Sequence, residues 1–210
     1  MSTVTVKPKR RTQAERIAQS EHQILHAAVT LIASKGPTDW TLAEVGKNAG
    51  YTGGLVSHRF GSKNGLLLAV TDRIVELFVE KNLAQIVGGK SSSKLLVSFF
   101  DLYIQQLKEG SDLFIAYHRL MAESQSTLPQ LRSAFEKINI RLRAAFEDAI
   151  IEGQTDGSLR PNLNPEFEAY SFAALFRGLT NLWLTGPRDI DIDRYAKYEC
   201  KHLLARLAHN

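Results

Sequence analysis

The chain has 210 residues, 44% of them hydrophobic and 23% charged, which excludes an intrinsically disordered protein and favours a folded globular one. It has no apolar run of the ~18–20 residues that a membrane helix needs and no apolar N-terminal signal, so we expect a cytoplasmic protein. Its only cysteine is Cys200, so we expect neither a disulfide nor a cysteine-ligated metal. Residues 1–65 carry nine Lys and Arg against four Asp and Glu, whereas residues 66–210 carry 17 against 18; the positive charge is concentrated in the first third, as expected of a segment that binds a polyanion.

Residues 1–11 are predicted to be a disordered basic arm. They include one proline and no acidic residue, and their charge comes from Lys7, Lys9, Arg10 and Arg11. Short basic arms can enter the minor groove of DNA, and we expect Lys9, Arg10 and Arg11 to do so. A solvated tail without a binding role is the alternative.

The residues after the arm are predicted to form helices almost throughout. The first helix has two possible starts, because residues 12–15 and residues 20–23 both fit the capping-box pattern; it ends at residues 36–37, Gly-Pro. A third capping box begins a short helix within residues 41–50, and Thr52 can cap another that runs to about residue 58.

The rest of the chain is also predicted to be helical, with a turn-rich connector at residues 153–161. Caps and stop signals place these helices at about residues 62–78, 91–109, 111–123, 129–151, 164–185 and 191–208. No segment of useful length alternates with the period of a strand, so the predicted fold class is all-α. We expect an N-terminal three-helix domain over residues 12–65 and a C-terminal helical domain over residues 66–210.

Residues 41–60 are predicted to form a helix-turn-helix. Two short helices joined by a tight glycine turn can hold one helix at a fixed angle in the major groove of DNA. Their apolar residues recur on one face, and the opposite face carries small or polar residues: Thr52, Gly53, Gly54, Ser57 and His58. A helical hairpin inside an all-helical core is the alternative interpretation.

Two segments resemble the DNA-binding signature of the tetracycline-repressor (TetR) family: residues 41–52 (TLAEVGKNAGYT) and residues 57–67 (SHRFGSKNGLL). The resemblance is specific over about residues 20–70 and weaker at residues 157–161 (GSLRP) and 177–179 (RGL). It implies an all-α homodimer, in which three N-terminal helices bind double-stranded DNA and the remainder forms a small-molecule pocket and a dimer interface.

The function that this resemblance implies is that of a ligand-responsive transcriptional regulator. We expect a repressor that a small-molecule effector releases from a palindromic operator. An activator is one alternative, and a helical protein-interaction module with a basic face is another.

The reading face departs from the family pattern, in which the position of Ser57 is often tyrosine and that of Gly53 often lysine. Gly53 and Gly54 in the first turn of a helix cost up to ~1 kcal/mol each relative to alanine, so we expect a weak recognition helix whose backbone approaches DNA closely. Contacts to the bases are then expected to be few and to come from Thr52, Leu55, Ser57 and His58.

Contacts to DNA phosphates are expected from the residues that flank the reading face: Thr41, Lys47, Arg59 and Lys63. Such contacts position a protein on DNA and carry no sequence information. We expect no enzyme activity and no cofactor, because the chain has neither a G-x-x-x-x-G-K loop nor a G-x-S-x-G elbow. His22 and His26 have the spacing of a metal pair but lack a third ligand, so no metal site is expected.

The C-terminal domain is predicted to supply both the pocket and the dimer interface. The pocket candidates are aromatic and polar residues of the helices: Phe99, Tyr103, Phe114, Tyr117, His118, Arg119, Arg143, Phe172 and Phe176. Packing in the core is the alternative for the aromatic residues. The last two helices carry apolar stripes that can pair with their symmetry mates in a four-helix bundle: Leu179, Leu182, Trp183, Leu203 and Leu207.

Overall fold

The structure is a computed structural model that describes residues 12–80 and 92–208. The predicted basic arm therefore lies outside the described residues. The described chain is built of helices, which confirms the all-α fold class; its one bridge between extended residues joins Leu159 and Ala208. The chain divides into two compact units, Met1–Val70 and Thr71–Asn210.

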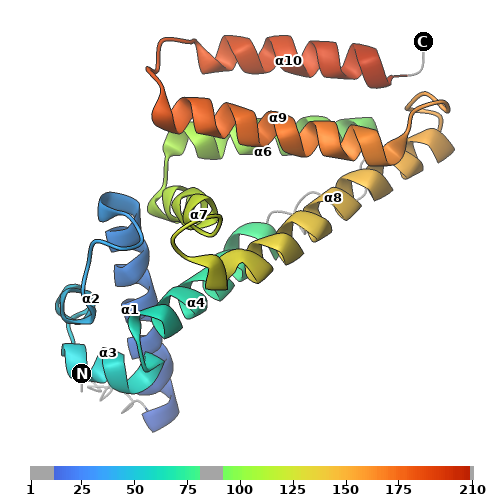
Figure 1. The fold of residues 1–210 in the computed structure, drawn as a ribbon. Coiled ribbons are helices and arrows are strands. Elements are labelled where there is room, and N and C mark those ends of the chain that lie inside the picture. The colour runs from blue at the N-terminus through green and yellow to red at the C-terminus, as the bar shows by residue number, and fades with distance from the viewer. Residues whose placement is uncertain (1–11, 81–91, 209–210) are drawn as a thin grey trace, which may run out of the picture. The chain divides into compact units, whose positions relative to one another are not determined.

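The first unit contains the predicted short helices (Figure 1): α1 (Gln13–Lys35), α2 (Leu42–Ala49), α3 (Gly53–Phe60) and the first part of α4 (Lys63–Ile74). Its core is made by one apolar face of each helix, and the fully buried side chains in it include Ile24, Ile32, Val45, Val56 and Leu66. Burial of these faces stabilises helices that are too short to persist alone in water.

The first of the two possible starts of α1 is confirmed. The Thr12 hydroxyl accepts from the backbone N–H of Glu15 at 3.2 Å, and the Glu15 carboxylate accepts from the Thr12 N–H at 2.7 Å. The second start is wrong. Ser20 is buried within α1, and its hydroxyl donates to the Ile17 carbonyl, because the helix simply continues through this residue.

The helix after α3 differs from its predicted form. Instead of one α-helix to about residue 78, α4 gives way to a π-helix, η1 (Val75–Glu80). Apolar spacing in the sequence does not distinguish an i→i+4 from an i→i+5 hydrogen-bond pattern over a few residues. The boundary between the two compact units falls inside α4, between Val70 and Thr71.

The second unit contains the remaining helices (Figure 1): α6 (Ser92–Glu109), α7 (Asp112–Glu123), the 3-10 turn η2 (Pro129–Leu131), α8 (Arg132–Thr155), α9 (Pro165–Thr185) and α10 (Ile192–Leu207). The start of α9 is as predicted, because the Asn164 side chain accepts from the Phe167 N–H at 3.0 Å and Pro165 occupies the first turn. The Arg206 guanidinium and the Glu168 carboxylate join α10 to α9 at 2.7 Å.

The predicted connector at residues 153–161 is partly wrong, because α8 continues to Thr155. Gly153 is buried inside the helix, so packing offsets its low helix propensity. The side chain of Gln154 then organises the chain that follows, since its Nε2 donates to the carbonyls of Arg160, Pro161 and Leu163 at 3.0–3.2 Å.

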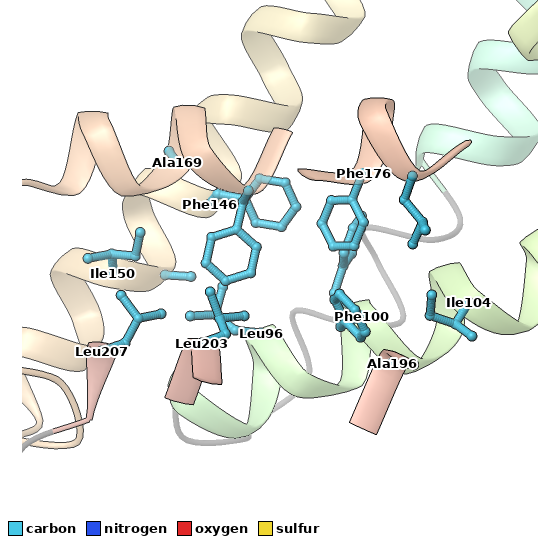
Figure 2. Close-up of a cluster of buried hydrophobic side chains, with 14 of the residues drawn as sticks. Leu96, Phe100, Ile104, Phe146, Ile150, Ala169, Phe176, Ala196, Leu203 and Leu207 are labelled. Atoms are coloured by element: carbon cyan, nitrogen blue, oxygen red, sulfur yellow. The ribbon is translucent and has the colours of Figure 1, made fainter. Parts of the chain in front are cut away.

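One hydrophobic core joins α6, α8, α9 and α10, and Figure 2 shows part of it. Phe100 and Phe172 are fully buried there, and Phe146 and Phe176 pack at a ring-centroid distance of 6.0 Å. The cluster also takes in three residues that the sequence assigned to the dimer interface: Leu179, Leu203 and Leu207. These three side chains pack in the hydrophobic core of a single protomer.

Candidate nucleic-acid interface and ligand cavity

A capping box and an ion pair fix the start of α2. The Thr41 hydroxyl accepts from the Glu44 N–H at 3.2 Å, and the Glu44 carboxylate accepts from the Thr41 N–H at 2.9 Å and from Lys35 Nζ at 2.7 Å. These hydrogen bonds, first from Lys35 and then from Thr41, lower the pKa of the Glu44 carboxyl. The helix-turn-helix is thereby tied to the end of α1.

The two glycines of α3 have different surroundings. A Cβ atom on Gly53 would lie 2.8 Å from the Cα of Ala43, and one on Gly46 would lie 2.7 Å from the carbonyl carbon of Thr52. A Cβ atom on Gly54 would meet only the Thr52 hydroxyl, at 3.8 Å. Gly53 is thus needed for the close packing of α3 on α2, whereas Gly54 faces open space.

Two of the expected phosphate-binding cations already have acceptors inside the first unit. Arg59 Nη1 donates to the Ile17 carbonyl at 2.8 Å and to the Ser20 hydroxyl at 2.6 Å, which ties α3 to α1. Lys63 Nζ donates to the carbonyls of Thr38 and Trp40 at 2.5 and 2.6 Å. It also lies 4.3 Å from the centre of the Trp40 ring, and burial lowers its pKa.

The remaining residues expected to contact DNA lie at the surface of the first unit. Thr41, Lys47, Thr52, Gly54, Ser57 and His58 are exposed, and Gly53 and Leu55 are half-buried. The Thr52 hydroxyl caps α3 by accepting from the Leu55 N–H at 3.2 Å. Tyr51, which sequence reasoning did not single out, fixes the turn, because its hydroxyl donates to the Gln23 side chain at 2.6 Å.

The second unit contains a cavity of about 540 Å³ between α6, α7, α8 and α9. Its size lies within the roughly 300–1,000 Å³ range of small-molecule sites. It is lined by Phe99, Leu102, Tyr103, Gln106, Tyr117, His118, Met121, Glu136, Ile138, Asn139, Ile140, Leu142, Arg143, Tyr170, Ala173, Ala174, Phe176 and Arg177.

The structure brings six of the nine pocket candidates to this cavity: Phe99, Tyr103, Tyr117, His118, Arg143 and Phe176. The other three do not line it. Phe114 and Phe172 are fully buried in the core cluster, and Arg119 is exposed outside the cavity. Sequence reasoning missed Tyr170, Ala174 and Arg177, although their spacing of four and then three residues is that of one helical face.

Three polar side chains of the cavity, Tyr103, Tyr117 and His118, are uncharged near neutral pH. Burial raises the pKa of Tyr103 and raises that of Tyr117 to about 12. Burial, and secondly the charge of Arg177, lower the pKa of His118 to about 3. The Tyr103 hydroxyl is hydrogen-bonded with the Thr180 hydroxyl and also donates to the Phe176 carbonyl at 3.3 Å. In contrast, the buried Nε2 of His118 has no hydrogen-bond partner among residues 12–80 and 92–208.

His118 should make the protein less stable in acid. The unfolded chain protonates this histidine below its ordinary pKa of 6.5, whereas the folded protein does not until about pH 3. The stability associated with His118 is therefore complete above pH 6.5 and is lost as the pH falls toward 3. Between pH 7.5 and 5, urea unfolding should show that wild type loses about 2 kcal/mol more than His118→Phe. Equal losses in the two proteins would contradict this account of the imidazole.

Two family models match this chain in the same order as its two units. Residues 24–70 match bacterial regulatory proteins of the tetR family, and residues 93–209 match the C-terminal part of BetI-type transcriptional repressors. The chain belongs to the TetR family. It is a DNA-binding transcriptional regulator, as its relatives are, and its helix-turn-helix is the family's DNA-binding element.

Curated relatives of this TetR-family chain are regulators of transcription. The regulator CymR of Pseudomonas putida is 29% identical over 141 residues, which cover 67% of this chain and 68% of CymR. The regulator TtgR of Pseudomonas putida is 26% identical over 192 residues, which cover 87% of this chain and 88% of TtgR.

Solved structures share the fold. A transcriptional regulator from Saccharomonospora viridis, in complex with choline, superimposes with a TM-score of 0.82 at 21% identity, over 92% of this chain and all of that one. A TetR-family regulator from Rhodococcus sp. does so with a TM-score of 0.70 at 26% identity, over 90% and 96% of the two chains.

Other kinds of site find no support in the residues that the structure describes. Over residues 12–80 and 92–208, no three His, Cys, Asp or Glu side chains are grouped so that they could hold a metal ion. No helix in these same ranges combines the length and apolar character needed to span a bilayer. The family and the relatives point to a regulator rather than an enzyme.

Proposed function

We propose that this TetR-family regulator is a dimeric repressor that a small molecule, bound in the cavity of the second unit, releases from a palindromic operator. The observation that carries the proposal is the cavity of about 540 Å³, lined by aromatic residues and a few polar groups. A cavity with these properties is typical of a ligand site. It belongs to the unit that does not contain the helix-turn-helix, so ligand binding and DNA binding are separate.

On the DNA side, we assign base contacts to Thr52, Leu55, Ser57 and His58, and a close backbone approach to Gly54. Four of these five residues are exposed, and Gly54 has open space where a side chain would be. Small residues at the start of a recognition helix allow its N–H groups to come close to a phosphate. Specificity then depends partly on the shape of the operator.

The phosphate contacts are assigned to Thr41, Lys47, Arg59 and Lys63. Lys47 is exposed in the last turn of α2. An ammonium group has three N–H donors, so Lys63 keeps one beyond its two carbonyl partners. Arg59 keeps its donors other than Nη1. Both cations therefore stabilise the helix-turn-helix in addition to facing DNA. A role in the minor groove for Lys9, Arg10 and Arg11 stays a prediction.

The dimer interface is assigned to α9 and α10, with Leu182 and Trp183 as its apolar contacts on α9. Leu182 is 68% exposed, although it is a large apolar side chain. On α10, Tyr198 is 58% exposed and extends the same kind of surface. Exposed apolar side chains on adjacent helices are a mark of a protein interface. Leu179, Leu203 and Leu207 support these helices from inside the protomer.

Release of DNA requires a free-energy coupling between the two sites. A coupling of ~1–3 kcal/mol weakens operator binding about 5–150-fold. The helix that joins the units, α4, begins three residues after α3 and continues into the second unit. We propose that α4 transmits the effect of ligand binding from the cavity to the helix-turn-helix. Ligand binding would thereby change the spacing of the two recognition helices in the dimer.

Selection of bound fragments from the genome of origin tests the proposed function. The full-length protein should enrich fragments with two inverted half-sites whose centres lie about 34–36 Å apart, one turn of DNA. Footprinting should show both half-sites protected by the same dimer, and a small molecule that binds the cavity should remove the protection. Enrichment without any shared sequence would contradict the proposal, as would a ligand that binds and leaves operator affinity unchanged.

A further inference from the structure

We propose that the cavity of the second unit takes an apolar molecule that carries one carboxylate, with the carboxylate beside Arg177. The inference rests on the proposed function only in naming this cavity as the effector site. It follows from the charges that face the cavity, from one buried polar atom that has no partner among the described residues and from the apolar walls.

The fixed charges at the cavity are predominantly positive. Three charged side chains line it, the guanidinium groups of Arg143 and Arg177 and the carboxylate of Glu136. The ion pairs found among the described residues all involve other side chains. Neither guanidinium is therefore neutralised within that part of the chain, and a bound anion would provide the missing negative charge.

Arg177 is exposed on α9 and lines the cavity. Burial raises the pKa of Tyr103 and of Tyr117 and outweighs the opposing charge of Arg177 there. At His118, burial and secondly the Arg177 charge both lower the pKa. Arg177 Nη2 donates to the Asn139 side chain, which orients the group from α8. The other N–H donors of the guanidinium can pair with a carboxylate in the fork geometry that arginine favours.

His118 supplies an unused polar atom at the same cavity. The residue is 8% exposed, and its Nε2 is buried without a hydrogen-bond partner in the part of the chain that the structure describes. Native proteins rarely leave such an atom unsatisfied unless a ligand or water completes it. The ring is neutral at pH 7 because burial disfavours its protonated form. In its Nε2–H tautomer it can donate to a carboxylate without adding a charge.

A cationic ligand fits the same surroundings poorly. Aromatic rings can hold a quaternary ammonium group, but the ring of Tyr170 already carries a cation, because the Arg143 guanidinium lies 4.5 Å from its centre. A ligand cation elsewhere in the cavity would lie near the unneutralised Arg177. Charge therefore favours a carboxylate over an ammonium group.

The rest of the ligand is expected to be apolar and at least partly aromatic. Phe99 and Phe176 line the cavity with an edge-to-face contact at 5.1 Å between their ring centres. Aromatic pairs of this kind readily accept a further ring. Leu102, Met121 and Ala173 extend the apolar wall.

The test uses three probes that share a naphthalene ring and differ in charge: 2-naphthoate, its near-isosteric amide 2-naphthamide and trimethyl(2-naphthyl)ammonium. Isothermal titration calorimetry on the full-length protein at pH 7.5 should show that 2-naphthoate binds about 10- to 100-fold more tightly than the amide, because a hydrogen bond to a charged group contributes more than one to a neutral group. The ammonium probe should bind more weakly than the amide.

Variants assign the preference to Arg177. Arg177→Gln should reduce 2-naphthoate affinity about 10-fold or more and leave the amide unchanged, whereas Arg177→Lys, which keeps the charge, should retain part of the preference. Arg119→Gln is the matched control, because Arg119 is exposed on α7 and does not line the cavity. Unchanged thermal unfolding of the unliganded variants verifies that they fold.

The outcomes separate this inference from the proposed function. No detectable binding of 2-naphthoate at millimolar concentration, equal affinity for all three probes or a preference for the ammonium probe would overturn the inference. An equal effect of Arg177→Gln on the acid and the amide would also overturn it. If 2-naphthoate binds through Arg177 but does not release operator DNA, the inference stands and the proposed effector role of the cavity fails.

Discussion

Leu182→Glu is expected to turn the proposed dimer into monomers and to weaken operator binding at least about 100-fold. The Leu182 side chain is 68% exposed on α9, so the protomer does not need it in order to fold. In the dimer, the glutamate would be buried in an apolar interface near its symmetry mate, and burial of an unpaired charge costs several kcal/mol. A monomer contacts only one half-site, so most of the operator affinity is lost with the dimer.

Analytical ultracentrifugation gives the assembly state, and a gel-shift titration gives the operator affinity. Ile151→Glu on α8 is the matched control, because Ile151 is also a large exposed apolar residue, at 45%, outside α9 and α10. Leu179→Glu is a poor test, since Leu179 is 8% exposed and belongs to the protomer core. A Leu182→Glu protein that remains dimeric would refute the assignment of the interface to this face of α9.

Gly53→Ala and Gly54→Ala are expected to have opposite effects on stability. A Cβ atom at position 53 would lie 2.8 Å from the Cα of Ala43, a backbone atom that cannot turn aside. Overpacking of this kind costs about 1–3 kcal/mol and would displace α3 from α2. At position 54 the nearest atom is 3.8 Å away, so the better helix propensity of alanine should stabilise the protein by up to ~1 kcal/mol.

Both substitutions should weaken DNA binding, but for different reasons. Gly53→Ala moves the recognition helix, whereas Gly54→Ala places a methyl group where the backbone of α3 is proposed to approach DNA. We expect losses of about tenfold or more in gel-shift titrations, alongside the opposite shifts in thermal unfolding. Full-strength DNA binding by Gly54→Ala would remove the close approach from the proposal. Wild-type stability of Gly53→Ala would show that α2 and α3 can separate without cost.

The helix boundaries could largely be predicted because they depend on local signals. Thr12, Thr41, Thr52 and Asn164 each cap a helix as expected, since a capping side chain needs only the N–H groups two or three residues later. The same local signals wrongly predicted a helix start at Ser20. The Ser20 hydroxyl accepts from Arg59, which lies 39 residues later, and nothing nearby in the sequence indicates that contact.

The sequence predicted that aromatic residues line the cavity, but it predicted less well which of them do so. Phe99 and Phe172 are both phenylalanines on predicted helices, and nothing in the sequence distinguishes their roles. In the structure Phe99 lines the cavity, whereas Phe172 is fully buried in the core. Which aromatic side chain faces a space and which fills the core depends on how four helices pack together. The position of Arg177 at the cavity was missed for the same reason, because most of the other lining residues come from three other helices.

By itself, the sequence determined the all-α class, the helix-turn-helix and the family resemblance, because each depends on residues that are neighbours along the chain. Only the tertiary structure separated the two glycines of α3: Gly53 packs against α2, and Gly54 does not. It likewise placed Leu179 in the core and left Leu182 exposed. The physical reason is that close packing is set by atoms from distant segments, and a single chain position does not carry that information.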